Sequence, residues 1–364
     1  MKNIQREIIK ELKIRSKQLG KISGEYLKIA FYCEESKHKK SKNTEAIQFN
    51  LNKSDELLKD GLNFMESLKD LLKMFDIETT KIWLCGENIR KKDVYFIHSS
   101  NEHPNDWWVE LLLVKDLCLS ASVKSLSFVL PNMFYSRQDR KTRSRVPVST
   151  RALGESISPG LKRVITIDLH SPQIQNAYPQ NVPVDNLYSF PEVVKYIRKN
   201  HFDVLKDLVV ISPDAGGVDR SMSFFKRLIN ANESDEIKHD YTFAFTHKLR
   251  SKPGEVGKMF FIGDVQDKNV LIIDDIFDSG KTVIECSKIL KENGAKKVLV
   301  YATHGLFTLG TKNILESFDN VMTSNTFYLP KEEDGNIEII DMAPLFAEAI
   351  YRAQEGLSVS KLFD

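Results

Sequence analysis

The sequence VLIIDDIFDSGKTV, residues 270–283, decides the fold of its half of the chain. Residues 270–273 form a short apolar run, typical of a buried β-strand, and the paired carboxylates Asp274 and Asp275 end it. Small and polar residues follow, and an amphipathic pattern that begins at Thr282 predicts a helix. A strand, a short loop and a helix in this order form one unit of an α/β fold.

The loop between this strand and this helix consists of five residues: Asp278, Ser279, Gly280, Lys281 and Thr282. Backbone N–H groups at the start of a helix have no partner within the helix and lie at the positive end of its dipole, so the loop can hold a phosphate. Asp274 and Asp275 repel an anion but can accept hydrogen bonds from the 2- and 3-hydroxyls of a ribose. Together these features predict a pocket for a 5-phosphorylated ribose.

Three other interpretations of this motif are weaker. Residues 274–278 also spell DDxxD, the magnesium signature of prenyl-chain synthases, but that signature lies inside a helix and here an apolar strand precedes it. Residues 280–282 resemble the end of a nucleotide-binding P-loop, yet Asp275 occupies the position of the required earlier glycine. A strand that ends in a solvated acidic turn is the alternative without a ligand.

Composition limits the classes of function. The chain has 364 residues, which is long enough for two domains that each bury a core. The 52 Lys and Arg nearly balance the 50 Asp and Glu, so bulk charge does not favour nucleic acid or a membrane surface as a partner. No apolar run has the length of a membrane span, and the charged N-terminus is unlike a secretory signal, so we expect a cytoplasmic protein.

Short apolar runs without clean alternation recur along the chain, at residues 94–98, 125–130, 164–168, 208–212, 270–274 and 298–302. Such runs are typical of strands that are buried on both faces of a parallel sheet. They predict two α/β domains in tandem, with ligands at the carboxyl ends of the strands. Residues 1–23 are expected to form an appended helix, and a further helix is expected near residues 57–75.

Three of these runs end in polar residues that suit ATP and magnesium. After residues 125–130 come Arg137, Gln138 and Asp139 within an arginine-rich stretch, for which polyphosphate binding competes with a solvated surface. After the next two runs come His170 and Asp214, an imidazole and a carboxylate that could share a hydrated magnesium ion. A structural histidine is the alternative for His170.

Two further cations, Lys248 and Arg250, end the segment FAFTHKLR, which is expected to be a strand. The segment SKPGEVGK follows and has the composition of a mobile loop. Cations on such a segment can close over a transferring phosphoryl group, and two solvated loop cations are the alternative.

Seven segments resemble ribose-phosphate diphosphokinases (phosphoribosyl pyrophosphate synthetases) in order and spacing, from about Lys92 to Asp364. They are FYSRQDRKTRSRVPVS, ITIDLHSPQIQ, VPVDNLYS, ISPDAGGVDR, FIGDVQDKNVLIIDD, NGAKKVLVYATHGLF and APLFAEAIYRAQEGLSVSKLF. The resemblance implies two tandem type I phosphoribosyltransferase-like domains, each with a mainly parallel sheet flanked by helices. An ATP-side domain would span residues 24–185, completed by 340–364, and a ribose-phosphate-side domain would span residues 186–339.

The resemblance also implies roles at matching positions. Arg137, Gln138 and Asp139 would bind ATP, and His170 and Asp214 would attend its Mg²⁺. Lys248, Arg250 and His170 would act in catalysis. Asp214, Asp274 and Asp275 would hold the ribose, and Asp278, Ser279, Gly280, Lys281 and Thr282 its 5-phosphate. The implied reaction transfers the β,γ-diphosphate of ATP to the anomeric 1-hydroxyl and releases AMP. A homo-oligomer, a dimer or a hexamer, is implied as well.

Three departures from the family pattern stand out. The family's Phe-Ser-Asp-Gly-Glu segment, which reaches a neighbouring subunit's ATP, is replaced by FDIETTKIWLCGENIR, where Phe75 and Glu78 are the nearest candidates. Lys281 occupies a position in the phosphate loop where the family has a small residue. His98 stands where the family has glutamine.

These departures leave alternatives open. Lys281 could meet the second phosphate of ADP-ribose, which phage-encoded members of the family convert to ADP-ribose 1-diphosphate for NAD synthesis; a phage-encoded protein would work in the host cytoplasm. A catalytically silent, synthetase-associated regulatory subunit is a further alternative, but such proteins tend to lose catalytic cations. A phosphoribosyltransferase would have no use for the ATP and magnesium segments.

Overall fold

A computed structural model of the chain describes residues 4, 7, 8, 10, 11, 27–31, 88–98, 103–233, 239–249, 258–327, 329 and 335–363. For residues 27–31, 233, 247–249, 258 and 259 it describes the backbone alone. The chain divides into two compact units. Asn3–Leu187 and Ala343–Leu362 form the amino-terminal unit, and Tyr188–Met342 form the carboxyl-terminal unit.

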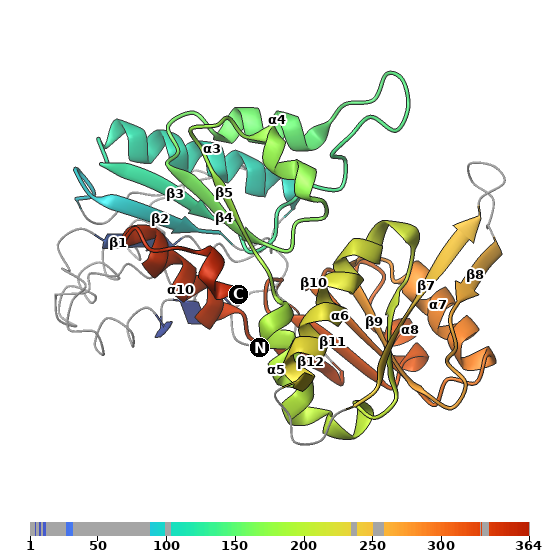
Figure 1. Cartoon of the computed structure of the whole chain (residues 1–364). Helices are drawn as coiled ribbons and strands as arrows, with labels where there is room; N and C mark the ends of the chain where they lie inside the picture. Colours follow the sequence, from blue (N-terminus) through green and yellow to red (C-terminus); the bar gives the residue numbers. More distant parts are fainter. Residues whose placement is uncertain are drawn as a thin grey trace. The chain divides into compact units, whose positions relative to one another are not determined.

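The amino-terminal unit is built on a sheet of five parallel strands in the order β1-β2-β3-β4-β5. The strands are β1 (Leu27–Phe31), β2 (Asp93–Ile97), β3 (Ser125–Val129), β4 (Arg163–Ile167) and β5 (Val184–Leu187). Helices α3 (Pro104–Ser120) and α4 (Ser149–Ile157) lie on one side of this sheet and α10 (Ala343–Gln354) on the other (Figure 1). Short 3-10 helices span Pro172–Ala177 (η1) and Ser360–Leu362 (η4).

The core of this unit explains why its strands read as unbroken apolar runs. All five residues of β2 are buried, because helices cover both faces of the sheet. Under α3 the side chains of Val94 and Phe96 pack with Trp107, Leu111 and Phe128. The helix begins at Pro104, whose missing N–H is not needed in the first turn.

The carboxyl-terminal unit has a sheet of seven strands in the order β12-β11-β10-β9-β6-β7-β8. The strands are β6 (Leu208–Ser212), β7 (Tyr241–Leu249), β8 (Lys258–Ile262), β9 (Asn269–Phe277), β10 (Lys297–Gly305), β11 (Asn320–Ser324) and β12 (Ile337–Ile340). Only β8, at one edge, pairs in the antiparallel sense. Helices α5 (Phe190–Asn200) and α6 (Val218–Glu233) cover one face, and α7 (Lys281–Glu292) and α8 (Lys312–Ser317) the other (Figure 1). Two 3-10 turns, η2 (Phe202–Val204) and η3 (Ala215–Gly217), complete it.

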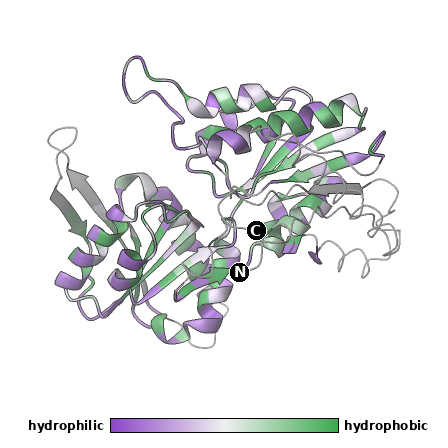
Figure 2. Cartoon of the chain, turned by 180° about the vertical axis from the view of Figure 1, so that it is seen from behind, coloured by the Kyte–Doolittle hydropathy of each residue, from purple (hydrophilic) through white to green (hydrophobic). Residues whose placement is uncertain are grey.

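The α/β fold that the sequence predicts is confirmed. All six apolar runs are strands of the two sheets, and the segment with Lys248 is β7. In Figure 2 the coloured strands in the centres of both sheets are mostly hydrophobic, whereas the loop between β3 and α4 is mostly hydrophilic. Strands β1, β5, β8, β11 and β12 were not predicted, because polar or charged residues interrupt or border their apolar residues.

Other expectations fall partly or wholly beyond the described residues. Residues 4, 7, 8, 10 and 11 are helical, and Ile4 and Ile8, one turn apart, are buried. The helix expected near residues 57–75 and the candidates Phe75 and Glu78 lie outside the described residues. Within the described part of the chain, no helix has the length and apolar character needed to cross a membrane.

Candidate active site

The predicted phosphate loop lies where β9 ends and α7 begins. Gly280 precedes the first residue of α7 and has a φ of +70°, a left-handed conformation that favours glycine. A Cβ at this position would lie 2.7 Å from Cδ1 of Ile314 on α8, so space as well as conformation requires glycine. Lys281 is the first residue of α7 and is exposed.

A neighbouring loop, residues 306–310 after β10, braces the phosphate loop. The backbone N–H groups of Leu306 and Phe307 donate hydrogen bonds to the Phe277 carbonyl at 2.7 and 2.9 Å. The Thr308 hydroxyl donates to Oδ1 of Asp278 at 2.5 Å. Because β10 pairs with β9, these contacts fix the first residue of the phosphate loop from the adjacent strand. The sequence analysis missed Thr308.

The two predicted ribose ligands have different surroundings. Asp275 is 4% exposed, and Nη1 of Arg220 donates to its Oδ1 at 3.1 Å. The Asp274 side chain is 22% exposed and lies 4.0 Å from the same guanidinium. The backbone N–H of Asp275 donates to Oδ1 of Asp274 at 2.9 Å. Asp275 is therefore fixed by an ion pair within the protein, and Asp274 is the more accessible carboxylate.

Burial and the neighbouring Asp275 carboxylate raise the pKa of Asp274 well above its usual value, and Arg220 opposes this shift. Two adjacent carboxylates repel each other, and a single guanidinium offsets only part of that repulsion. The site thus keeps one paired carboxylate and one that holds its proton more strongly than a free aspartate.

Arg220, which pairs with Asp275, was not predicted from the sequence. It lies in the first turn of α6, directly after the turn that carries Asp214. The next residue, Ser221, is buried and donates to the Ile273 carbonyl at 3.2 Å. Because β6 and β9 are neighbours in the sheet, the start of α6 is attached twice to the end of β9.

Asp214 occupies a tight turn at the end of β6. Its Oδ1 accepts a hydrogen bond from the Gly217 N–H at 2.9 Å, and its carbonyl accepts one from the Ser212 hydroxyl at 2.7 Å. A Cβ at Gly217 would lie 2.9 Å from the Ser212 hydroxyl oxygen, so the turn requires glycine. Asp214 itself is exposed.

The predicted catalytic cations lie at the border of the described residues. Lys248 is in β7, opposite Met259 of β8, and only its backbone is described. Arg250 lies outside the described residues.

The predicted ATP ligands lie in the loop between β3 and α4, residues 130–148, which we call the arginine-rich loop. Arg137 is exposed, and Gln138 and Asp139 are partly buried. The Asp139 carboxylate accepts a hydrogen bond from the Ser171 hydroxyl at 2.5 Å, which brings the loop beside the segment that carries His170. His170 follows β4 and is exposed. Asp139 and the His170 segment thus share one edge of the sheet.

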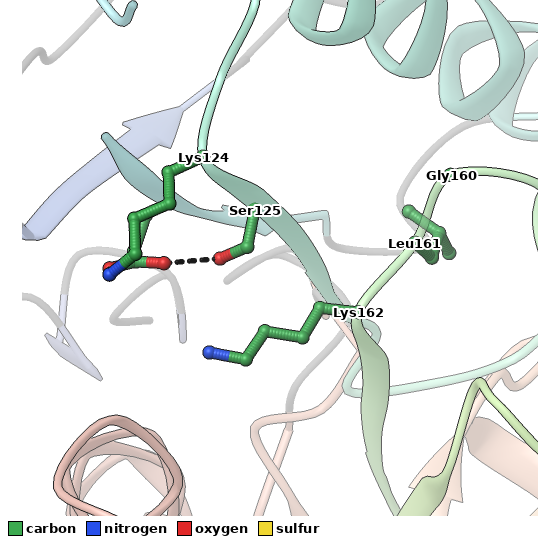
Figure 3. Close-up of a pocket in the computed structure, with 6 residues that line it drawn as sticks. Lys124, Ser125, Gly160, Leu161 and Lys162 are labelled. Carbon is green, nitrogen blue, oxygen red and sulfur yellow. Dashed lines mark hydrogen bonds and ion pairs between the residues drawn. The ribbon is translucent and has the colours of Figure 1, made fainter. Parts of the chain in front are cut away.

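A pocket of about 400 Å³ lies at the opposite, amino-terminal edge of this sheet (Figure 3). Lys124, Ser125 and Lys162 line it, together with Asp93. Burial raises the pKa of Asp93, but hydrogen bonds from Ser125 and Lys124 outweigh burial, so the pKa lies below its usual value. Its carboxylate, Asp93, is paired with Lys124 and Ser125 of the protein itself. No group of three metal-ligating side chains occurs among the residues described.

Comparisons with known proteins agree on one family. A family model described as the N-terminal domain of ribose phosphate pyrophosphokinase matches residues 72–158, and one described as a phosphoribosyl synthetase-associated domain matches residues 230–364. Ribose-phosphate pyrophosphokinase 2 of Schizosaccharomyces pombe is 38% identical over 285 residues, which cover 76% of this chain and 84% of that protein. The chain belongs to the ribose-phosphate pyrophosphokinase family. It is an enzyme of the ribose-phosphate diphosphokinase type.

Two further comparisons support the same family assignment. Ribose-phosphate pyrophosphokinase 4 of Saccharomyces cerevisiae is 38% identical, with 76% of this chain and 82% of that protein covered. The crystal structure of phosphoribosylpyrophosphate synthetase from Mycobacterium smegmatis matches with a TM-score of 0.66 and 29% identity, over 77% of this chain and 89% of that one. The resemblance drawn from the sequence is thereby confirmed at the level of the family.

Proposed function

We propose that this enzyme transfers the β,γ-diphosphate of ATP to the anomeric 1-hydroxyl of a 5-phosphorylated ribose, with release of AMP. The observation that carries the proposal is the edge formed by the ends of β6 and β9. There a phosphate loop that requires Gly280 adjoins two carboxylates of which one, Asp274, is accessible. Phosphate and vicinal hydroxyls of one small molecule match these groups.

The amino-terminal unit would supply the nucleotide side. Arg137 and Gln138 would contact ATP from the arginine-rich loop, and Asp139 would order that loop through Ser171. Lys248 and Arg250 would neutralise the charge that develops on the transferred group, since phosphoryl transfer requires positioning and electrostatic stabilisation rather than a protein nucleophile. These assignments follow the family pattern at matching positions.

His170 and Asp214 each have the donor chemistry to attend magnesium held by substrate phosphates, as the family pattern assigns. Both side chains are exposed at carboxyl ends of strands, and one oxygen of Asp214 already accepts the Gly217 N–H. A short set of protein ligands fits Mg²⁺, because this ion retains several waters and binds phosphate oxygens. The ion would neutralise charge on the diphosphate. The residues themselves would bind the ion and orient the phosphates.

Ribose 5-phosphate is the acceptor we favour, because the relatives carry the name ribose-phosphate pyrophosphokinase. ADP-ribose is the second candidate, and one observation favours it: Lys281 is exposed at the first position of α7, beside the phosphate loop. A long cation there can reach a phosphate beyond the first one. The product would then be ADP-ribose 1-diphosphate.

The test is a reaction with ATP, magnesium and either ribose 5-phosphate or ADP-ribose. We expect AMP to form with at least one acceptor, and the acceptor that works identifies the substrate. No AMP from either acceptor would overturn the proposal and favour a silent, synthetase-associated subunit, the role that one family description suggests. We also propose a homo-oligomer, which sedimentation at assay concentrations would test.

A further inference from the structure

A buried imidazole and a buried carboxylate, which form an ion pair when the imidazole is protonated, lie just beyond the carboxyl end of β2. The Nε2 atom of His98 lies 2.9 Å from Oε2 of Glu110 on α3, and the two side chains are 2% and 0% exposed. The backbone N–H of His98 donates to the Val129 carbonyl at 3.0 Å, so the residue extends the pairing of β2 with β3. Ionisable side chains are seldom buried this completely unless they are paired, so each of the two requires the other.

This pair packs against the tryptophan that supports the arginine-rich loop. The ring of His98 stacks on Trp107 with the centroids 6.1 Å apart and the planes at 19°. Trp107 is fully buried, and its ring meets that of Phe134 edge-on at 5.5 Å. Phe134 precedes Arg137 by three residues. A continuous series of packed rings therefore joins the His98–Glu110 pair to Phe134, near the start of the arginine-rich loop.

The residue after Phe134 shows how firmly the start of the loop is held. Tyr135 has a φ of +62°, which is unfavourable for a residue with a side chain. Its ring packs on Trp108 at 5.0 Å, its hydroxyl donates to the side-chain oxygen of Asn105, and its carbonyl accepts from the Ser149 hydroxyl at 2.8 Å. Such a conformation persists where surrounding contacts enforce it, and two of these contacts come from the start of α3.

We propose that the His98–Glu110 pair is a positioning device for nucleotide binding, which acts on Arg137 through Trp107 and Phe134. The inference rests on the proposed function, because it assigns the arginine-rich loop to ATP. A buried ion pair adds little net stability, since desolvation offsets the attraction. Its effect is to hold α3, through Glu110, against the end of β2. This contact fixes the position of the arginine-rich loop. Neither residue of the pair touches the nucleotide.

The other end of the same strand supplies a matched control. Asp93 opens β2, is 1% exposed and lies 2.9 Å from Nζ of Lys124, a residue shown in Figure 3. Asp93→Asn removes a buried charge at the edge remote from the arginine-rich loop. Its effect should be a lower midpoint of thermal unfolding with unchanged ATP binding.

The experiment measures binding of magnesium-ATP and of ribose 5-phosphate by calorimetry in the full-length enzyme. His98→Leu and Glu110→Leu should each weaken ATP binding about tenfold or more, with the affinity for ribose 5-phosphate unchanged within about twofold. The double variant should recover most of the loss, because replacing both partners by apolar groups leaves no buried polar side chain without its partner. Phe134→Leu keeps the ion pair but interrupts the ring contacts, so it should show the same loss of ATP binding.

Two results would overturn the inference. One is unchanged ATP binding in His98→Leu together with a loss of thermal stability equal to that of Asp93→Asn. The other is equal weakening of ATP binding and of ribose 5-phosphate binding. If His98→Leu does not fold, unchanged ATP binding in Phe134→Leu overturns the inference instead. Failure of the proposed function looks different, because the wild-type enzyme itself would then bind no ATP and release no AMP.

Discussion

The edge of the carboxyl-terminal sheet and the edge of the amino-terminal sheet differ in how their polar side chains are held. At the first edge, Asp275 is fixed by Arg220, and Asp278 by Thr308, without any ligand. At the second edge, Arg137 and His170 are exposed, and the Asp139 carboxylate accepts a hydrogen bond from the Ser171 hydroxyl. The first edge suits a small acceptor that must be oriented, and the second suits a longer, more flexible polyphosphate.

The largest effect should come from the cations on β7 and just beyond it. Lys248→Ala and Arg250→Ala should each lower turnover by on the order of 100-fold or more, because their contact strengthens as charge moves onto the transferred group. ATP affinity should change little. Steady-state rates and ATP binding would be measured together. Equal losses in turnover and in ATP affinity would mean that these residues bind ATP in its ground state. They would then say nothing about the difference between the two edges.

The next-largest effect should distinguish the two carboxylates, Asp274 and Asp275, at the edge of the carboxyl-terminal sheet. Asp275→Asn leaves Arg220 without its 3.1 Å partner, so it should cost about 1–3 kcal/mol in the free energy of unfolding. Asp274→Asn removes a carboxylate with a raised pKa, so it should stabilise the fold at neutral pH and weaken the acceptor more. Denaturant unfolding and acceptor binding test both statements. Identical behaviour of the two variants would refute the division of roles between them.

The sequence predicted well which polar residues follow the strands, but it did not predict the residues that contact them. A buried strand followed by polar residues is a local pattern, so Asp214, Asp274 and the phosphate loop could be placed without a structure. Arg220 and Thr308 could not, because their roles depend on which strands are neighbours in the sheet. No local signal states that β9 lies between β6 and β10.

His98 and Glu110 show the same limit of prediction from sequence, because the contact between them is not local. The sequence marked His98 as a departure from the family, but its partner lies on the following helix. One signal could have revealed it: Glu110 is the only charge within the apolar stretch WWVELLLV, and an ionisable residue in such a stretch indicates a buried pair. The pairing itself still required the structure.

A smaller effect should follow from closing the space at the phosphate loop. Gly280→Ala places a methyl group against Ile314 in a left-handed conformation, which should cost about 1–2 kcal/mol and displace the loop, so acceptor binding weakens. Gly356→Ala is the matched control, because Gly356 has a φ of +68° but open space around its Cα, and it follows α10 in the other unit. A comparable loss of stability with intact acceptor binding is expected for the control. Equal acceptor binding in both variants would argue against the phosphate loop.

The pH dependence of acceptor binding should report on Asp274. The pKa of this folded carboxyl lies well above 3.8, so the proton-bound form persists to higher pH than in the unfolded chain. Its stabilising contribution is therefore present below about pH 3.8 and is lost as the pH rises through the raised value. Acceptor binding, which needs the carboxylate, should improve over that same rise. Asp274→Asn should abolish this pH dependence of stability and of acceptor binding. An unchanged pH dependence in the variant would mean that another group titrates.

The smallest effect, and the one that depends most on the substrate, concerns Lys281. Its side chain is exposed at the start of α7, where the family uses a small residue, so it either covers the 5-phosphate or reaches a group beyond it. If ADP-ribose is the acceptor, Lys281→Gly should weaken it much more than ribose 5-phosphate, because only ADP-ribose has a second phosphate for the ammonium to meet. If ribose 5-phosphate is the acceptor, the change should be mild, since the backbone N–H groups of the loop still bind the phosphate. Specificity constants for both acceptors in wild type and variant decide between these cases, and equal losses for both would mean that Lys281 does not select the acceptor.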